Sequence, residues 1–147
     1  MNKIISDFWE WLNMTPDQYA QNGIDTLTNT EESDYPHFED LINYAQTIID
    51  QIECSDEELE DVLLIMALDN EDEDVLDYIQ THCSESRLER LIRLGISYYQ
   101  PEARWQIALL ICRRKISNAK ELLELLSHDI HPYVRRRALN CLNSMLL

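Results

Sequence analysis

Apolar residues recur along the chain at intervals of three and four positions, the spacing of one face of an α-helix. The first apolar stripe consists of Ile4, Ile5, Phe8, Trp9 and Leu12. Residues 15–18 then have the pattern of a capped helix start, with Pro16 at the first helical position and Gln18 three residues after Thr15. We expect this short helix to end near Asn22-Gly23, before a polar loop over residues 25–35.

The helical pattern resumes at Pro36 and continues to about Cys54. From Ser55, where Glu58 completes a capping-box pattern, we expect pairs of helices joined by short turns, the first turn at residues 70–74. The first helices of these pairs are expected to begin at Ser55, Leu88 and Ala119, and the second helices at Val75, Pro101 and Pro132.

Two segments in the C-terminal part of the chain repeat one another at an offset of 31 residues. Residues 100–112 align with residues 131–142 when Pro101 is placed on Pro132, and this also places Arg104 on Arg135. Upstream, the same offset places Leu91, Ile92 and Leu94 on Leu122, Leu123 and Leu125. An internal period of this length indicates a stack of similar supersecondary units, here helix pairs.

The motif Pro-x-Val-Arg-x-x-Ala, from Pro132 to Ala138, resembles the opening of the second helix of a HEAT repeat. A looser copy opens at Pro101. The Asp that the family usually places before the proline is present as Asp129, whereas Tyr98 stands there in the other copy. This difference argues against a ladder of Asp–Arg pairs.

The resemblance implies an all-α fold, because HEAT-like proteins stack helix pairs into a curved solenoid whose second helices line the concave face. It covers residues 86–147 well, residues 56–83 poorly and residues 1–54 not at all. We therefore expect one domain, a short α-α superhelix. Residues 55–147 would form about three helix pairs, and residues 1–54 would form a divergent N-terminal helical cap.

Composition narrows the class of protein further. Two glycines and four prolines in 147 residues leave few tight turns, which disfavours β-sandwiches and excludes glycine-rich phosphate loops. No apolar run is long enough to span a bilayer, and no signal-peptide pattern is present, so we expect a cytoplasmic protein. The four cysteines are 29 residues apart, at Cys54, Cys83, Cys112 and Cys141. They include no CxxC pair, which favours reduced, buried thiols over a zinc site.

Charge is distributed unevenly along the chain, whose formal net charge is −16. Residues 1–86 contain 23 acidic residues and one basic residue, a net charge of −22. Residues 87–147 contain 5 acidic and 11 basic residues, a net charge of +6. High net charge also serves solubility, but an excess this concentrated costs stability through self-repulsion, which a cationic partner would relieve. Nucleic acid is disfavoured, because the acidic half would repel phosphates.

Residues that could carry catalysis or bind metal are few. His128 and His131 stand in an expected turn, where polar residues are ordinary, and adjacent His82 and Cys83 point in different directions on a helix. Metalloprotease, nucleophile-elbow and phosphate-loop motifs are missing from the sequence. We expect no catalytic residue, metal or cofactor. The basic clusters at residues 113–115 and 135–137 could contact DNA in a HEAT-like protein, but we expect their arginines to bond to helix carbonyls.

The predicted partner-binding residues are an acidic run and three aromatic residues. They are Asp69, Glu71, Asp72, Glu73, Asp74, Asp77, Tyr98, Tyr99 and Trp105. The acidic run could also be a hydrated turn whose carboxylates favour the following helix dipole. Trp105 suits the core and a binding anchor equally, and the two tyrosines could lie on the same rim as Trp105.

These features favour a binding protein over an enzyme. The specific hypothesis is an acidic immunity protein that covers the active site of a basic cognate toxin, such as a nuclease. The alternatives are a HEAT-like scaffold or adaptor and a HEAT-like enzyme or lyase. For the preferred hypothesis we expect a monomer or weak dimer with no membrane or nucleic-acid partner.

Overall fold

The computed structural model describes residues 1–22 and 34–146, and within these ranges the regular secondary structure is helical. Most of the predicted loop over residues 25–35 lies outside them. The described part of the chain has nine α-helices: α1 (Lys3–Leu12), α2 (Pro16–Asn22), α3 (Phe38–Asp50), α4 (Asp56–Leu68), α5 (Asp74–His82), α6 (Glu85–Gly95), α7 (Pro101–Arg113), α8 (Ala119–Leu126) and α9 (Pro132–Met145). The predicted all-α class is therefore confirmed. Among the described residues, every helix is too short or too polar to cross a bilayer.

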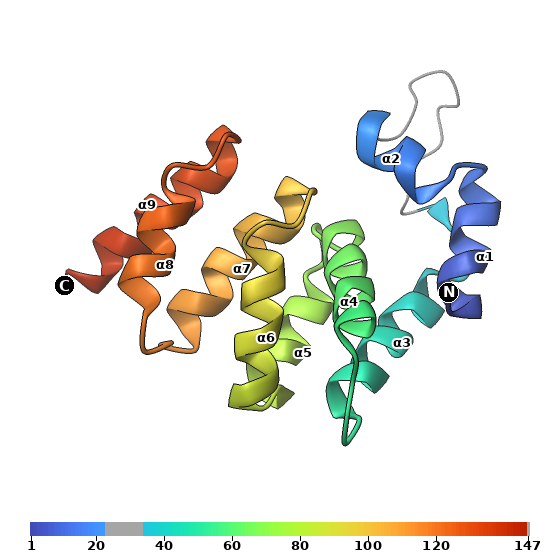
Figure 1. Ribbon diagram of the computed structural model, residues 1–147, viewed down its shortest axis with the longest axis horizontal. Coiled ribbons are helices and arrows are strands. Elements are labelled where there is room, and N and C mark those ends of the chain that lie inside the picture. Colours follow the sequence, from blue (N-terminus) through green and yellow to red (C-terminus); the bar gives the residue numbers. More distant parts are fainter. Residues whose placement is uncertain (23–33, 147) are drawn as a thin grey trace.

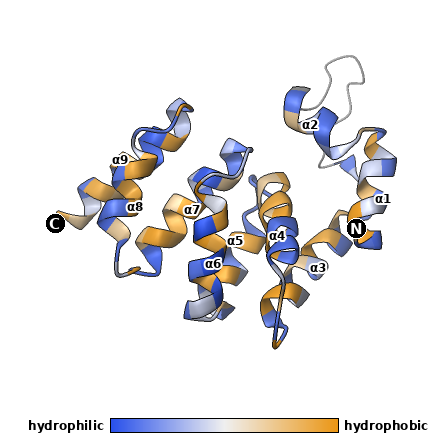
Figure 2. Cartoon of the chain, viewed as in Figure 1, coloured by the Kyte–Doolittle hydropathy of each residue, from blue (hydrophilic) through white to orange (hydrophobic). Residues whose placement is uncertain are grey.

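The helices follow one another along the longest axis of the molecule, with the two chain ends far apart (Figure 1). Helices α3, α5, α7 and α9 contact one another in that order, while α4 packs against α3, α5, α6 and α7. Hydrophobic residues cover the helix faces that meet in the interior (Figure 2). Helices α4 and α7 lie in the middle of the stack, and residues 62–68 and 103–111 are buried on all sides.

Local capping sets several helix starts as predicted. The Thr15 hydroxyl accepts from the Gln18 N–H at 3.1 Å, and the Gln18 side chain accepts from the Thr15 N–H at 2.9 Å. Ser55 and Glu58 form the corresponding box at the start of α4. Helix α3 is shorter than predicted, because Pro36 lies in a turn before it and the chain becomes extended at Gln51.

Two buried or half-buried arginines close the carboxyl ends of earlier helices. Arg87 donates to the carbonyl oxygens of Ile48, Ile49 and Ile52 at the end of α3. Arg114 donates to the carbonyl oxygens of Ile79, Gln80 and Cys83 at the end of α5. The two sets of carbonyls are 31 residues apart, the offset found in the sequence. Within the basic clusters at residues 113–115 and 135–137, Arg114 bonds to helix carbonyls as predicted, whereas Arg113 donates to the Gln80 side chain and Arg137 to the Tyr133 hydroxyl.

One Asp–Arg pair joins α7 to the turn before α9. Arg104 donates from Nε and Nη2 to the two carboxylate oxygens of Asp129, at 2.8 and 3.0 Å, and both side chains are buried. Burial acts to raise the pKa of Asp129, but Arg104 and the His131 N–H outweigh it and lower that pKa. Arg104 also donates to the Tyr98 carbonyl, and Arg135 makes the corresponding bond to the Asp129 carbonyl 31 residues further along the chain.

A cluster of aromatic residues packs together at the N-terminal end of the molecule. Phe8 packs against Trp9, Trp11 and Tyr35, and Trp11 contacts Tyr35 with a centroid distance of 5.2 Å. Trp9 is buried, and Trp11 packs on the last residue of the predicted 25–35 loop.

Candidate partner-binding site

The acidic run begins at the end of α4 and continues through a tight turn into α5. Asp69 follows the last residue of α4, and its Oδ2 accepts from the Val75 N–H at 2.9 Å, which caps the start of α5. Glu73 has a φ of 58°, a left-handed conformation that lets the chain reverse within the turn. This local geometry decides where each carboxylate points.

The carboxylates of the α4–α5 turn line two different grooves. Asp69, Asp72, Asp74 and Asp77 line one groove, whereas Glu71 and Glu73 line another. The first groove, which we call the α3–α5 groove, has a volume of about 680 Å³. Its lining comprises Phe38, Glu39, Ile42, Asn43, Gln46, Asp69, Asp72, Asp74, Asp77, Tyr78 and Thr81. Five of these described residues are acidic and none is basic.

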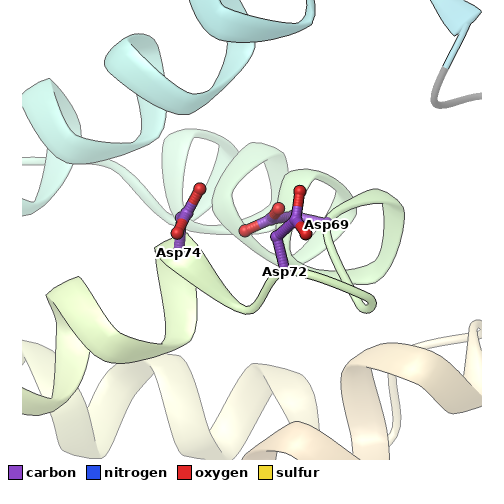
Figure 3. A group of neighbouring side chains, drawn as sticks. All are labelled: Asp69, Asp72 and Asp74. Atoms are coloured by element: carbon purple, nitrogen blue, oxygen red, sulfur yellow. The ribbon is translucent and has the colours of Figure 1, made fainter.

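Asp69, Asp72 and Asp74 form a group of neighbouring carboxylates at the α4–α5 turn (Figure 3). One carboxylate oxygen of each lies within 4.8 Å of the others, and Asp69 is only 4% exposed. Burial raises the pKa of Asp69 to about 6. The hydrogen bond from the Val75 N–H acts to lower this pKa, and the negative charges of Asp74 and Asp72 act to raise it. A cation beside this trio would favour the ionised form of Asp69.

The chemistry of the trio suits two kinds of cation. Carboxylate oxygens can ligate Ca²⁺ or Mg²⁺, although exposed acidic groups are common without an ion. They equally accept hydrogen bonds from ammonium and guanidinium groups. The apolar side chains of Phe38, Ile42 and Tyr78 in the same groove favour a Lys or Arg side chain, whose aliphatic stem packs on apolar surface.

The second groove, which we call the Trp105 groove, lies on the other side of the α4–α5 turn. It has a volume of about 370 Å³ and is lined by Asn70, Glu71, Glu73, Pro101, Glu102, Trp105, His131, Tyr133 and Arg137. Trp105 is only 7% exposed, since Tyr133 packs edge-on against it and the Arg137 guanidinium covers its ring. Trp105 is therefore mostly a packing residue, and direct contact with a partner would require Arg137 to move.

Tyr98 and Tyr99 line a third groove, of about 500 Å³, together with residues of α1, α4 and α6. Their rings contact each other with a centroid distance of 4.7 Å, and burial raises the pKa of both phenols. They precede α7 and face the N-terminal helices, whereas Trp105 lies one turn inside α7 and faces α9. The predicted common rim is wrong, because the structure assigns the tyrosines and Trp105 to different grooves.

Sequence reasoning missed the α3 wall of the α3–α5 groove. This wall consists of Phe38, Glu39, Ile42, Asn43 and Gln46. The three polar members recur at intervals of four and three residues, a helical face that was available in the sequence but resembles any hydrated face. Only the packing of α3 against α5 identifies it as one side of a groove.

The residues considered for catalysis have ordinary structural roles. The His82 ring stacks on Tyr78 with a centroid distance of 4.0 Å, and the His131 Nδ1 accepts from the Tyr133 N–H. Burial raises the pKa of the Cys83 thiol to about 11, so little thiolate is present at neutral pH. This arrangement makes Cys83 a poor nucleophile.

Several arginines of the C-terminal part make contacts within the molecule. Arg90 pairs with Asp56, Arg104 with Asp129, and Arg135 donates to the carbonyls of Asp129 and Ile130. Among these described residues, Arg90 and Arg104 are paired with a carboxylate, whereas the bonds to carbonyl oxygens leave the other guanidinium groups charged.

Comparison of the chain with protein-family models, curated proteins and solved structures found no match. The resemblance to HEAT repeats therefore depends on the segments that open at Pro101 and Pro132. The function has to be inferred from the charge, shape and side-chain chemistry of the grooves.

Proposed function

We propose that the chain is a protein-binding module whose α3–α5 groove takes a basic protein. The observation that carries the proposal is a groove of about 680 Å³ lined by five carboxylates and no basic residue. Lys or Arg side chains fit this lining, with their stems on Phe38, Ile42 and Tyr78 and their charged ends beside the carboxylates. Neutral or acidic partners would leave the carboxylates unpaired.

The specific form of the proposal is an immunity protein that neutralises a basic cognate toxin. A nuclease toxin has a positive substrate groove, and an acidic inhibitor that covers it replaces the charge of the phosphates. The net charge of −16 would also accelerate association by electrostatic steering. The proposal places the chain in the cytoplasm, where its four free thiols stay reduced, as a monomer or weak dimer with no metal or cofactor.

A HEAT-like superhelix is the proposed form of the fold. Two features support it: the 31-residue offset between the helix ends closed by Arg87 and Arg114, and the order of contacts from α3 to α9. The same offset places Arg136 and Asn140 of α9 where α7 has buried Trp105 and Leu109.

A general scaffold is the second candidate function. It is favoured by the presence of three separate grooves, at α3–α5, at Trp105 and at the tyrosine pair, which could take segments of different partners. An immunity protein needs one dominant partner, whereas a scaffold needs several of comparable affinity. Counting the partners therefore separates the two functions.

Affinity capture with the tagged chain, in cells that naturally produce it, tests the proposal. We expect one dominant basic partner that elutes with salt, is encoded beside this chain, and loses its enzymatic activity when one equivalent of the chain is added. The variant Glu39→Gln/Asp72→Asn/Asp77→Asn, with fewer carboxylates in the groove, should capture much less of it. An acidic partner, or equal capture by this variant, would contradict the proposal.

A further inference from the structure

One arginine, Arg137, lines the Trp105 groove and is bound to two of its aromatic residues. Its guanidinium carbon lies 5.1 Å from the centroid of the Trp105 ring and 5.0 Å from that of Tyr133. The two rings meet at 89° and form a corner around the guanidinium. Nε of Arg137 donates to the Tyr133 hydroxyl at 2.9 Å, and Nη2 donates to the same oxygen. These contacts favour this position of the side chain before any partner binds.

Arg137 has no carboxylate partner among residues 1–22 and 34–146, although Glu71, Glu73 and Glu102 line the same groove. Its Nη1 donates to no acceptor in that part of the chain. Arg90 and Arg104 each pair with an Asp, and Arg87, which also lacks a carboxylate, donates from both Nη1 and Nη2 to backbone carbonyls. In a chain with 28 acidic and 12 basic residues, a fixed guanidinium with unused N–H groups points to an acceptor supplied from outside.

We propose that Arg137 binds an Asp or Glu side chain of the basic partner, at a place where that carboxylate is flanked by Lys or Arg. The inference rests on the proposed binding of a basic protein. The flanking cations would lie beside Glu71, Glu73 and Glu102, which offsets the repulsion between these glutamates and the partner carboxylate. The guanidinium is already ordered, so less side-chain entropy is lost when it pairs with a carboxylate.

This pairing would supply the specificity that the α3–α5 groove lacks. A groove lined only by carboxylates attracts any basic surface, including those of many nucleic-acid-binding proteins. The two grooves lie on either side of the α4–α5 turn, because the turn residues line both. A partner surface that spans the turn would meet both grooves, and one with only Lys and Arg opposite Arg137 would be repelled there.

Two peptides provide the test, acetyl-Lys-Lys-Glu-Lys-Lys-amide and its Gln counterpart, measured against the full chain by NMR titration. Substitution of Arg137→Gln should shift the preference between them by about tenfold away from the Glu peptide, as expected for loss of a charge-assisted pair. Arg136→Gln is the matched control, since Arg136 is exposed on the same helix and the charge change is identical. It should leave the preference unchanged.

The Arg Nε–H resonance of Arg137 in the wild-type chain gives a readout that does not depend on the folding of a variant. It should shift with the Glu peptide and stay in place with the Gln peptide. Equal preference in the wild type and Arg137→Gln, or the same response to both peptides, would overturn the inference alone. Failure of both peptides to bind the wild type would overturn the proposed function and the inference with it.

Discussion

The guanidinium of Arg87 closes the carboxyl end of α3, and replacing it by methionine should destabilise the chain by about 3 kcal/mol. Methionine keeps an unbranched stem but removes every N–H donor. Arg87 donates to the carbonyl oxygens of Ile48 and Ile49 at 3.1 and 2.6 Å, in a buried environment, and to that of Ile52 at 3.1 Å. Water can reach the last of these more easily, because that bond is only partly buried.

Two buried acceptors therefore determine the size of the effect. Each hydrogen bond from a charged donor contributes about 1.5 kcal/mol or more, which gives about 3 kcal/mol for the pair. Because the free energy of unfolding of natural domains is about 5–15 kcal/mol in total, this loss is large enough to measure without ambiguity.

Urea denaturation of the wild type, Arg87→Met and Arg93→Met measures the loss. Arg93 lies on the same helix, is exposed and makes no hydrogen bond or ion pair in the described part of the chain, so its substitution should change the free energy of unfolding by less than about 0.5 kcal/mol. A loss below about 1 kcal/mol for Arg87→Met, or equal losses for the two variants, would refute the role of the buried carbonyl bonds.

Three further substitutions test other local features by the same denaturation assay. Asp69→Asn should raise the free energy of unfolding at pH 7.5 by up to about 2 kcal/mol, because the Asp69 pKa is raised to about 6 and the ionised form destabilises the fold. This gain should shrink as the pH falls from 7 towards 4, where the carboxyl becomes protonated, and a gain independent of pH would contradict it. Lys115→Gly should raise the free energy of unfolding by about 1 kcal/mol, because Lys115 has a φ of 52°, a left-handed conformation that glycine adopts without strain. An unchanged free energy of unfolding would argue against strain at Lys115. Gly95→Ala should destabilise by about 2 kcal/mol, because a Cβ would lie 2.5 Å from the Ile107 Cγ1, and a neutral result would show that Ile107 can move.

Much of the helical fold was predictable because its signals are local. The capping boxes at Thr15 and Ser55, and the prolines at positions 101 and 132, each define a helix start from a few neighbouring residues. The end of α3 was less predictable. It depends on Arg87, which reaches the last carbonyls of α3 from another helix, 35 or more residues along the chain.

The candidate site was predictable only in part. The acidic run was identified from composition, but the division of its carboxylates between two grooves follows from the left-handed Glu73 and the capping bond of Asp69. Trp105 and Arg137 are 32 positions apart, and no pattern in the sequence indicated that they meet. Such contacts are set by how α7 packs on α9, which no short sequence window contains.

The central claim is that the α3–α5 groove recognises a basic protein, and stopped-flow association with the captured partner tests it most directly. The rate constant should fall steeply with ionic strength and be about tenfold lower for Glu39→Gln/Asp72→Asn/Asp77→Asn. The control Asp17→Asn/Glu89→Gln/Glu121→Gln removes the same charge from exposed positions that do not line the groove. Its association rate constant should fall much less. Equal losses in both variants, or association indifferent to salt, would contradict the claim.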